Sequence, residues 1–168
     1  IAAADLVKVA ERGSRRPEVR AAVPSQSGHK RESAEFVVLA LMIQDWNAIA
    51  SWMNEALFAD DVYRRAFLAL IATEGELNAA LEAADPEARE ALERAAVADV
   101  ESQPDAEAFN LISAAVRREL SHRVKNVDPE QIRVDREARL LLEQMENPAT
   151  SHDAAEQLLG WLKMCMSE

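Results

Sequence analysis

The side chains best suited to chemistry in this chain of 168 residues are three histidines and one cysteine, His29, His122, His152 and Cys165. No two of them stand at the spacing of metal ligands, and neither a C-x-x-C nor an H-E-x-x-H motif occurs. The sequence also lacks a G-x-G-x-x-G motif, a Walker-type phosphate loop and a G-x-S-x-G elbow. We therefore expect no catalytic residue, no metal site and no cofactor.

Paired acidic residues are the remaining candidates for acid–base chemistry. Asp60 and Asp61 directly precede a helical pattern, where carboxylates complement the helix dipole. Caps of this kind are common in helical proteins, so the pair favours a structural role. An enzyme with an unfamiliar acidic site stays open as an alternative, and it would require carboxylates that converge in a pocket with perturbed pKa values.

The charge of the chain is strongly negative and unevenly distributed. Its formal net charge is −11, from 19 Lys and Arg against 30 Asp and Glu. Residues 1–32 carry a net charge of +3, which leaves −14 for residues 33–168. Because an acidic surface repels phosphate, we expect no direct contact between the main domain and nucleic acid. Its partners are expected to be proteins.

Three further features concern the cellular setting. The single Cys165 excludes a disulfide within the chain and is typical of a reducing cytoplasm. No run of about 18 apolar residues occurs, so we expect no membrane-spanning segment. The chain begins with Ile and lacks the basic-then-apolar order of a signal peptide. These features predict a fragment of a longer cytoplasmic protein.

The composition predicts an all-α fold. Hydrophobic residues make up 49% of the chain, but the aromatic share is only 5%, so Ala, Leu, Val and Ile must build most of the core. Only four glycines occur, and there is no Asn-Gly or Asp-Gly pair to form the tight hairpins of a sheet. A chain of this length can bury a single core with an appendage.

Residues 34–71 contain most of the large apolar side chains and predict three short helices in one core. The first is apolar almost all round, which indicates a helix covered on most sides. Asp45 is predicted to cap a second helix that runs to Leu57. Asp60 is predicted to cap a third helix. The third helix places Tyr63, Phe67, Leu70 and Ile71 on one predicted buried face.

The rest of the chain divides at turn signals. Residues 1–32 are predicted to be the end of an upstream helix and a basic flexible linker, since Gly, Pro and Ser interrupt them. Further helices are predicted over residues 74–84, after Asp85-Pro86 and from Pro104, which completes a predicted bundle of about six helices over residues 33–126. Two more helices in residues 127–168 form a predicted C-terminal hairpin, because the turn at 147–150 is too short for any arrangement but antiparallel packing.

The predicted hairpin has apolar stripes on both helices and little core of its own. It must either fold back on the bundle or present apolar surface to a partner. Trp161 stands at the edge of the stripe formed by Leu158, Leu159 and Leu162, and tryptophan is enriched at interface hot spots. Burial of Trp161 against the preceding helix and contact with a partner are equally consistent with its position.

Five segments together resemble the C-terminal helicase-binding domain of bacterial DNA primase. That family has an apolar first helix ending in Gln, an Ile-x-x-Trp-like helix, the pair Leu-Phe, and an acidic cap before a Tyr-Arg-x-x-Phe helix. The matching segments here are LALMIQ at 39–44, IASW at 49–52, LF at 57–58 and DDVYRRAF at 60–67. The segment AAEQLLGWLK at 154–163 is similar to the closing helix of one branch of the family.

The resemblance implies a non-catalytic role in DNA replication, in the primosome. In that family the C-terminal hairpin docks on the N-terminal domain of the replicative DNA helicase, and the bundle modulates helicase activity. The zinc-binding and polymerase domains of the parent primase would lie upstream, so we expect no polymerase activity here. The partner-binding residues expected on the exposed parts of the hairpin are Leu158, Leu159, Trp161, Leu162, Arg139, Leu142 and Glu143.

Other partners and other identities are also open. Some members of that family bind the acidic tail of single-strand-binding protein through a basic C-terminal patch. Lys163 is the only cation in the last helix, which argues against this partner here. The rival identities are the N-terminal helical domain of the replicative helicase, which would self-associate in a ring, and a helical adaptor unrelated to replication.

Overall fold

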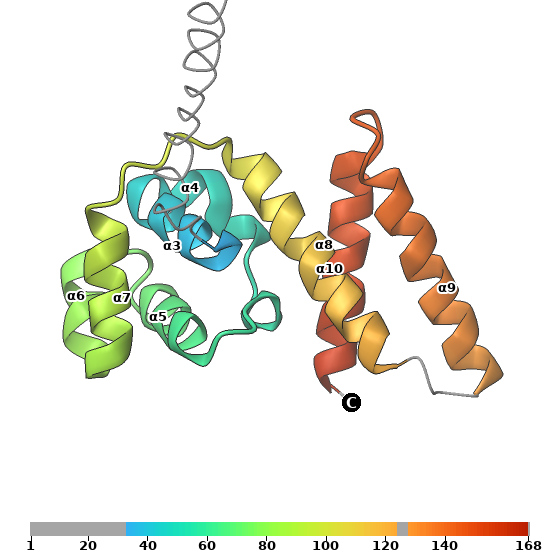
Figure 1. The fold of residues 1–168 in the computed structure, drawn as a ribbon, viewed down its shortest axis with the longest axis horizontal. Coiled ribbons are helices and arrows are strands. Elements are labelled where there is room, and N and C mark those ends of the chain that lie inside the picture. The colour runs from blue at the N-terminus through green and yellow to red at the C-terminus, as the bar shows by residue number, and fades with distance from the viewer. Residues whose placement is uncertain (1–32, 124–127, 168) are drawn as a thin grey trace, which may run out of the picture. The chain divides into compact units, whose positions relative to one another are not determined.

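The computed structural model describes residues 33–123 and 128–167, and every regular element in these two ranges is a helix. The predicted all-α class is therefore confirmed (Figure 1). The predicted linker over residues 1–32 and the predicted boundary at residue 126 lie outside the described residues. In chain order the elements are α3 (Ala34–Gln44), α4 (Trp46–Ile49), the 3-10 turns η1 (Ala50–Trp52) and η2 (Glu55–Leu57), α5 (Asp61–Ala72), α6 (Leu77–Ala83), α7 (Pro86–Ala96), α8 (Pro104–His122), α9 (Pro129–Gln144) and α10 (Ser151–Ser167).

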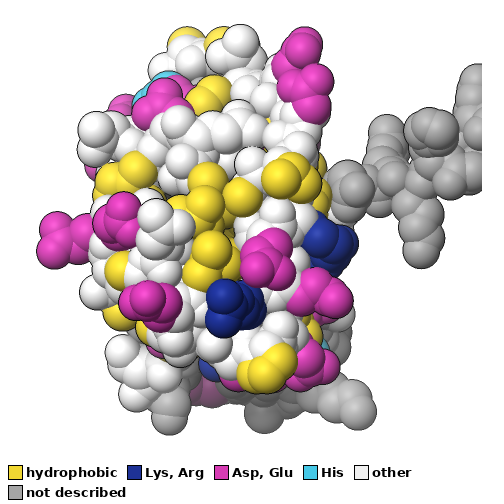
Figure 2. Space-filling view, turned by 90° about the vertical axis from the view of Figure 1, so that its left-hand side faces the viewer, with side chains coloured by type: hydrophobic (Ala, Val, Ile, Leu, Met, Phe, Trp, Pro, Cys, Tyr) yellow, Lys and Arg dark blue, Asp and Glu magenta, His cyan; other side chains and the backbone are white. Residues whose placement is uncertain are grey.

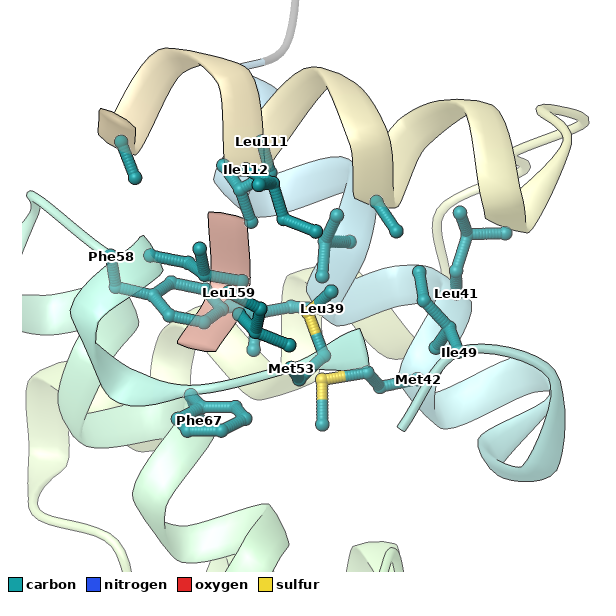
Figure 3. Packing of buried hydrophobic residues seen from close by; sticks show 14 of the residues in the cluster. Leu39, Leu41, Met42, Ile49, Met53, Phe58, Phe67, Leu111, Ile112 and Leu159 are labelled. Carbon is teal, nitrogen blue, oxygen red and sulfur yellow. The ribbon is translucent and has the colours of Figure 1, made fainter. Parts of the chain in front are cut away.

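Helix α3 is the centre of the core. Its N-cap Ser33 accepts a hydrogen bond from the backbone N–H of Phe36 at 3.2 Å, which fixes the start of the helix. It packs against α4, α5, α7 and α8, so it is buried on most sides, as its continuous apolar run predicts. Val38, Leu39 and Met42 are fully buried. Figure 3 shows Leu39 and Met42 among side chains from the surrounding helices.

The predicted second helix is broken, which corrects the expectation of one helix up to Leu57. Asp45 stands at the N-cap of α4, but its side chain makes no capping hydrogen bond. Helix α4 ends after one turn at Ile49, and Met53 has the extended backbone angles φ −95° and ψ 145°. Asn54 then caps η2 by accepting a bond from the N–H of Ala56 at 2.9 Å. The Asn54 side chain thus binds a backbone N–H group and begins a second short turn.

Helices α5 to α7 follow their predicted caps. The Asp60 carboxylate accepts from the N–H groups of Val62 and Tyr63, and Asp85 accepts from the N–H of Ala88 at 3.0 Å with Pro86 as the first helical residue. Ile71 is 40% exposed, so its predicted inward position is wrong. Leu70 is on the buried face of α5. Ile71 is the next residue, and a step of one residue turns the side chain by about 100°, which places Ile71 away from that face.

The surface over α6 and α7 is rich in carboxylates. Glu82, Glu87, Glu90 and Glu93 are all exposed there. Figure 2 views the molecule from the side of these helices and shows Asp and Glu side chains spread around small hydrophobic areas. Whether this surface repels phosphate stays a prediction.

Helix α10 lies between α8 and α9 and packs against both (Figure 1). Its buried residue Leu159 belongs to the same hydrophobic cluster as Phe58 and Ile112, and Figure 3 shows the three side chains together. Residues 33–168 accordingly form one compact unit. The C-terminal helix is therefore part of the main core and not an arm separated from it.

Candidate functional site

Helices α9 and α10 are each fixed at the turn or cap that precedes them. The Asp128 carboxylate accepts from the N–H of Glu130 at 3.3 Å, and Pro129 is the first residue of α9. After α9, the hydroxyl of Thr150 donates to the carbonyl of Gln144 at 2.7 Å. This bond closes the short turn, and α9 and α10 run antiparallel side by side (Figure 1).

The apolar stripe of α10 is buried, which corrects the expectation that it would face a partner. Leu158 has no exposed surface, and Leu159 and Leu162 are 7% and 3% exposed. The reason is the position of α10 between two helices, since α8 covers one side of the stripe and α9 the other. Burial of each leucine favours folding by about 1.5–3 kcal/mol. These side chains hold the hairpin in place in the described structure.

Trp161 is also buried, with 7% of its surface exposed. The guanidinium carbon of Arg123 lies 5.7 Å from the centre of its ring, within the range of a cation–π contact. Its indole N–H has no hydrogen-bond partner among the described residues. Of the two roles left open by the sequence, the structure favours packing, because a buried ring presents little surface to a partner.

The other three expected site residues are not brought together either. Leu142 is 8% exposed and packs inward, whereas Arg139 and Glu143 are exposed. Arg139 lies two residues before Leu141 and Glu143 two residues after it. At about 100° per residue, both side chains are on the side of α9 opposite Leu141. Whether they contact a partner stays a prediction, and neither of them lines the apolar surface described next.

A shallow apolar groove of about 400 Å³ runs between the outer faces of α9 and α10. Gly160 and Met164 line it from α10, and Met164 is 57% exposed. The surface at Gly160 is open, because a Cβ placed there would have no neighbour within 4 Å. The remaining lining residues are Val134, Glu137, Ala138, Leu141, Gln157 and Trp161.

A second hollow of about 200 Å³ shares three of these lining residues and extends the groove along α9 to Gln144. Leu140, which is 51% exposed, forms part of its wall. From Val134 to Gln144 the groove follows α9 for about 15 Å, at 1.5 Å per residue. The only sequence signal at this surface is Gly160 itself, since a glycine inside a helical pattern costs about 1 kcal/mol relative to alanine.

Charges at the edge of the groove are already paired within α9. Arg133 donates to Glu137 at 2.8 Å and also bonds Glu130. The hydrogen bond to Glu130, with the negative charges of both glutamates, raises the pKa of Arg133 above its usual value. The groove therefore presents an apolar floor with an edge whose charges are partly neutralised, which suits apolar contact with another protein.

A polar cluster lies beneath the hairpin, where α9 begins. Asp135 is buried, lies 3.3 Å from Nε of Arg123 on α8, and accepts from the side-chain amide of Gln131 at 2.7 Å. Arg123 also contacts Glu119 at 3.5 Å and donates to Sγ of Cys165 at 3.3 Å. These bonds connect α8, α9 and α10, so the cluster fixes the hairpin on the rest of the core.

The described residues offer no evident centre for metal or redox chemistry. In residues 33–123 and 128–167, no group of three or more His, Cys, Asp or Glu side chains could hold a metal ion. His152 packs against aromatic rings and lies 3.3 Å from Asp105, and His122 is exposed. Of the helices in the same two ranges, none has the length and apolar character needed to cross a bilayer.

Comparisons with known proteins add no assignment. No family model, no curated protein and no solved structure matches this chain.

Proposed function

We propose that this chain is a non-catalytic interaction domain of a bacterial DNA primase that docks on the replicative DNA helicase through α9 and α10. The single observation that carries the proposal is the apolar groove between these helices, with Leu141, Gly160 and Met164 along it. An open apolar surface of this kind is typical of a protein-binding site. The resemblance to the primase family supplies the identity of the partner.

The shape of the groove favours a helix as the partner element. Its length of about 15 Å corresponds to about three turns of an α-helix. Helix-in-groove recognition places apolar residues at successive turns into such a surface. The N-terminal domain of a replicative helicase, which is helical in the family, supplies a partner of this type.

The proposed contact residues differ from those expected from the sequence. The accessible apolar side chains are Leu140 and Met164, together with half-buried Val134 and Leu141. Leu158, Leu159 and Leu162 support this surface from beneath, because they hold α10 against α8. In this arrangement α3 to α8 form the bundle and α9 and α10 the docking hairpin.

Docking of this kind recruits an enzyme without taking part in its chemistry. A domain tethered to the polymerase part of a primase raises the local concentration of that part at the helicase, and so at the replication fork. The acidic surface of residues 33–168 makes no direct contact with nucleic acid in this proposal, because it repels phosphate. Single-strand-binding protein is not included, since the last helix has only the cation Lys163 for its acidic tail.

Co-sedimentation with the purified replicative helicase from the same source tests the proposal. The chain is expected to sediment as a monomer alone and with the helicase ring when the two are mixed. Ring-sized self-association without added helicase would instead favour the alternative, an N-terminal domain of the helicase itself. A monomer that never joins the helicase would leave an unrelated helical adaptor as the better interpretation.

A further inference from the structure

Trp52 forms part of an aromatic cluster at the surface, away from the groove between α9 and α10. Its ring meets Phe109 edge to face, with centroids 5.0 Å apart and an interplanar angle of 89°. The ring of His152 lies 5.6 Å from Trp52 and 5.1 Å from Phe109. Trp52 is half-buried, so two rings fix it while part of its surface stays accessible. It is therefore a rigid platform.

A hollow of about 280 Å³ lies beside this platform, lined by Ser51, Trp52 and Glu156. It is slightly smaller than the pockets of about 300–1,000 Å³ that bind drug-sized ligands. Its walls combine one aromatic ring, one hydroxyl and one carboxylate. The size and the lining suit a single charged side chain with an apolar stem.

The carboxylates around the hollow have few local counter-charges. Asp153 and Glu156 are exposed, and in the described part of the chain neither has an ion-pair partner. Lys163 follows Glu156 by seven residues, or about 10 Å along the helix, a distance at which salt screens its charge. The N-terminal dipole of α10 disfavours a cation nearby, but Asp153 in the first turn offsets it.

From this geometry we infer that the hollow binds an Arg or Lys side chain from a basic segment of a protein partner. The cation stacks on the ring of Trp52, and the carboxylate of Glu156 pairs with it. Cation–π contacts are strongest with tryptophan. The charge of −14 over residues 33–168 attracts a basic segment to this surface. The site shares no lining residue with the groove and does not depend on the proposed helicase partner.

An exposed tryptophan can also stack on a nucleic-acid base. Such a base arrives with its phosphates, and Asp153 and Glu156 would repel them at this position. The charge around Trp52 therefore favours a basic peptide over a single strand of DNA or RNA. The two occupants give different results in the same experiment.

The test is a titration of ¹⁵N-labelled protein with a capped Gly-Arg-Gly-Arg-Gly peptide, monitored at the indole N–H signals. Trp52→Phe identifies the Trp52 signal. That signal is expected to shift with peptide concentration, while the signals of Trp46 and Trp161 move less. A neutral Gly-Ser peptide of the same length should leave all three unchanged.

Matched charge variants separate a site from diffuse attraction. Glu156→Gln is expected to weaken peptide binding about threefold, the effect of losing one exposed charge pair. Glu82→Gln removes the same charge from an exposed position of α6 and should change the affinity by less than about 1.5-fold. Lys163→Gln should tighten binding slightly. Circular dichroism checks that each variant is folded.

Three results would overturn the inference. The first is a peptide titration in which the Trp52 signal moves no more than those of the other tryptophans. The second is an equal loss of affinity in Glu156→Gln and Glu82→Gln, which would show attraction by overall charge alone. The third is a selective shift of the Trp52 signal by an oligothymidylate and not by the arginine peptide, which would assign the platform to nucleic acid.

Discussion

Nε of Arg123 lies 3.3 Å from Oδ1 of Asp135, and both side chains are almost fully buried, at 12% and 7% exposed. The pair joins the end of α8 to the first half of α9. The pair lies close in sequence to residues 124–127, which connect the two helices. The position of α9 and α10 on the core therefore depends on a buried charge pair as well as on apolar packing.

Asp135→Asn is predicted to destabilise the protein by about 2 kcal/mol. The substitution leaves the buried guanidinium of Arg123 without the carboxylate, although Asn keeps an acceptor for Gln131. Urea unfolding monitored by circular dichroism measures the change. The control is Asp99→Asn, an exposed residue outside any helix, which should change stability by less than about 0.5 kcal/mol. Equal stability of the two variants would mean that the pair contributes nothing to holding α9.

Two glycines predict substitution effects of opposite sign. Gly75 has φ +83°, and a Cβ there would lie 2.6 Å from Cδ2 of Trp46, so Gly75→Ala should destabilise by about 2 kcal/mol or more. Gly160 is inside α10 with open space around it, so Gly160→Ala should stabilise by up to about 1 kcal/mol. Thermal unfolding of both variants checks the signs. A stabilised Gly75→Ala variant would contradict the described contact with Trp46.

The ion pairs of Arg65 predict an acid-dependent link between α5 and α7. Arg65 bonds Asp61 at 2.8 Å, Glu87 at 3.1 Å and also Asp85, the cap of α7. Hydrogen bonds from Arg65 are the main cause that lowers the pKa of both Asp61 and Asp85 below 3.8. A lowered pKa in the folded state means that the stabilisation is complete above the unfolded value and is lost as the pH falls through the folded value.

Arg65→Gln should therefore lower the melting temperature at pH 7, and the difference from the original protein should shrink below about pH 4. Thermal unfolding at a series of pH values between about 2 and 7 measures it. The matched control Arg89→Gln removes an exposed cation on α7 whose only ion pair in the described part of the chain is with Glu93. A constant difference between Arg65→Gln and the original protein down to pH 2 would show that these carboxylates are not responsible.

Local signals in the sequence predicted much of the fold. Asp60, Asp85 and Asp128 cap helices as expected, because capping depends only on a few neighbouring backbone groups. The buried environment of α3 also followed from its own composition. The break after Ile49 was missed, since Trp46, Ile49, Met53 and Leu57 keep helical spacing while their backbone does not. The spacing of apolar residues predicts which side chains are buried, but it does not determine the backbone conformation between them.

The candidate site was predicted less well, for a physical reason. An apolar stripe shows that Leu158, Leu159 and Leu162 need cover, but periodicity does not say whether the chain itself or a partner supplies it. In the structure α8 and α9 supply it, and the open surface lies on the flank marked by Gly160 and Met164. That flank depends on how two helices pack against a third, which is a long-range property of the fold.

The burial of α10 also determines how docking should be tested. Deleting the chain after residue 126 would remove α10, which packs against α8. The deletion would uncover residues of the buried cluster such as Phe58 and Ile112. Loss of binding by such a truncation could reflect loss of folding. A substitution that blocks the groove without touching the core is more informative, and Gly160 offers one because nothing lies within 4 Å of a Cβ there.

The most direct measurement is the affinity of the Gly160→Glu and Ala114→Glu variants for the purified replicative helicase, by isothermal titration calorimetry. Both changes add one carboxylate to an exposed small residue of a helix, but only Gly160 lies in the groove. The proposed docking predicts that Gly160→Glu raises the dissociation constant at least tenfold, or about 1.4 kcal/mol, while Ala114→Glu changes it by less than about twofold. Unchanged binding by a folded Gly160→Glu variant would contradict docking through this groove.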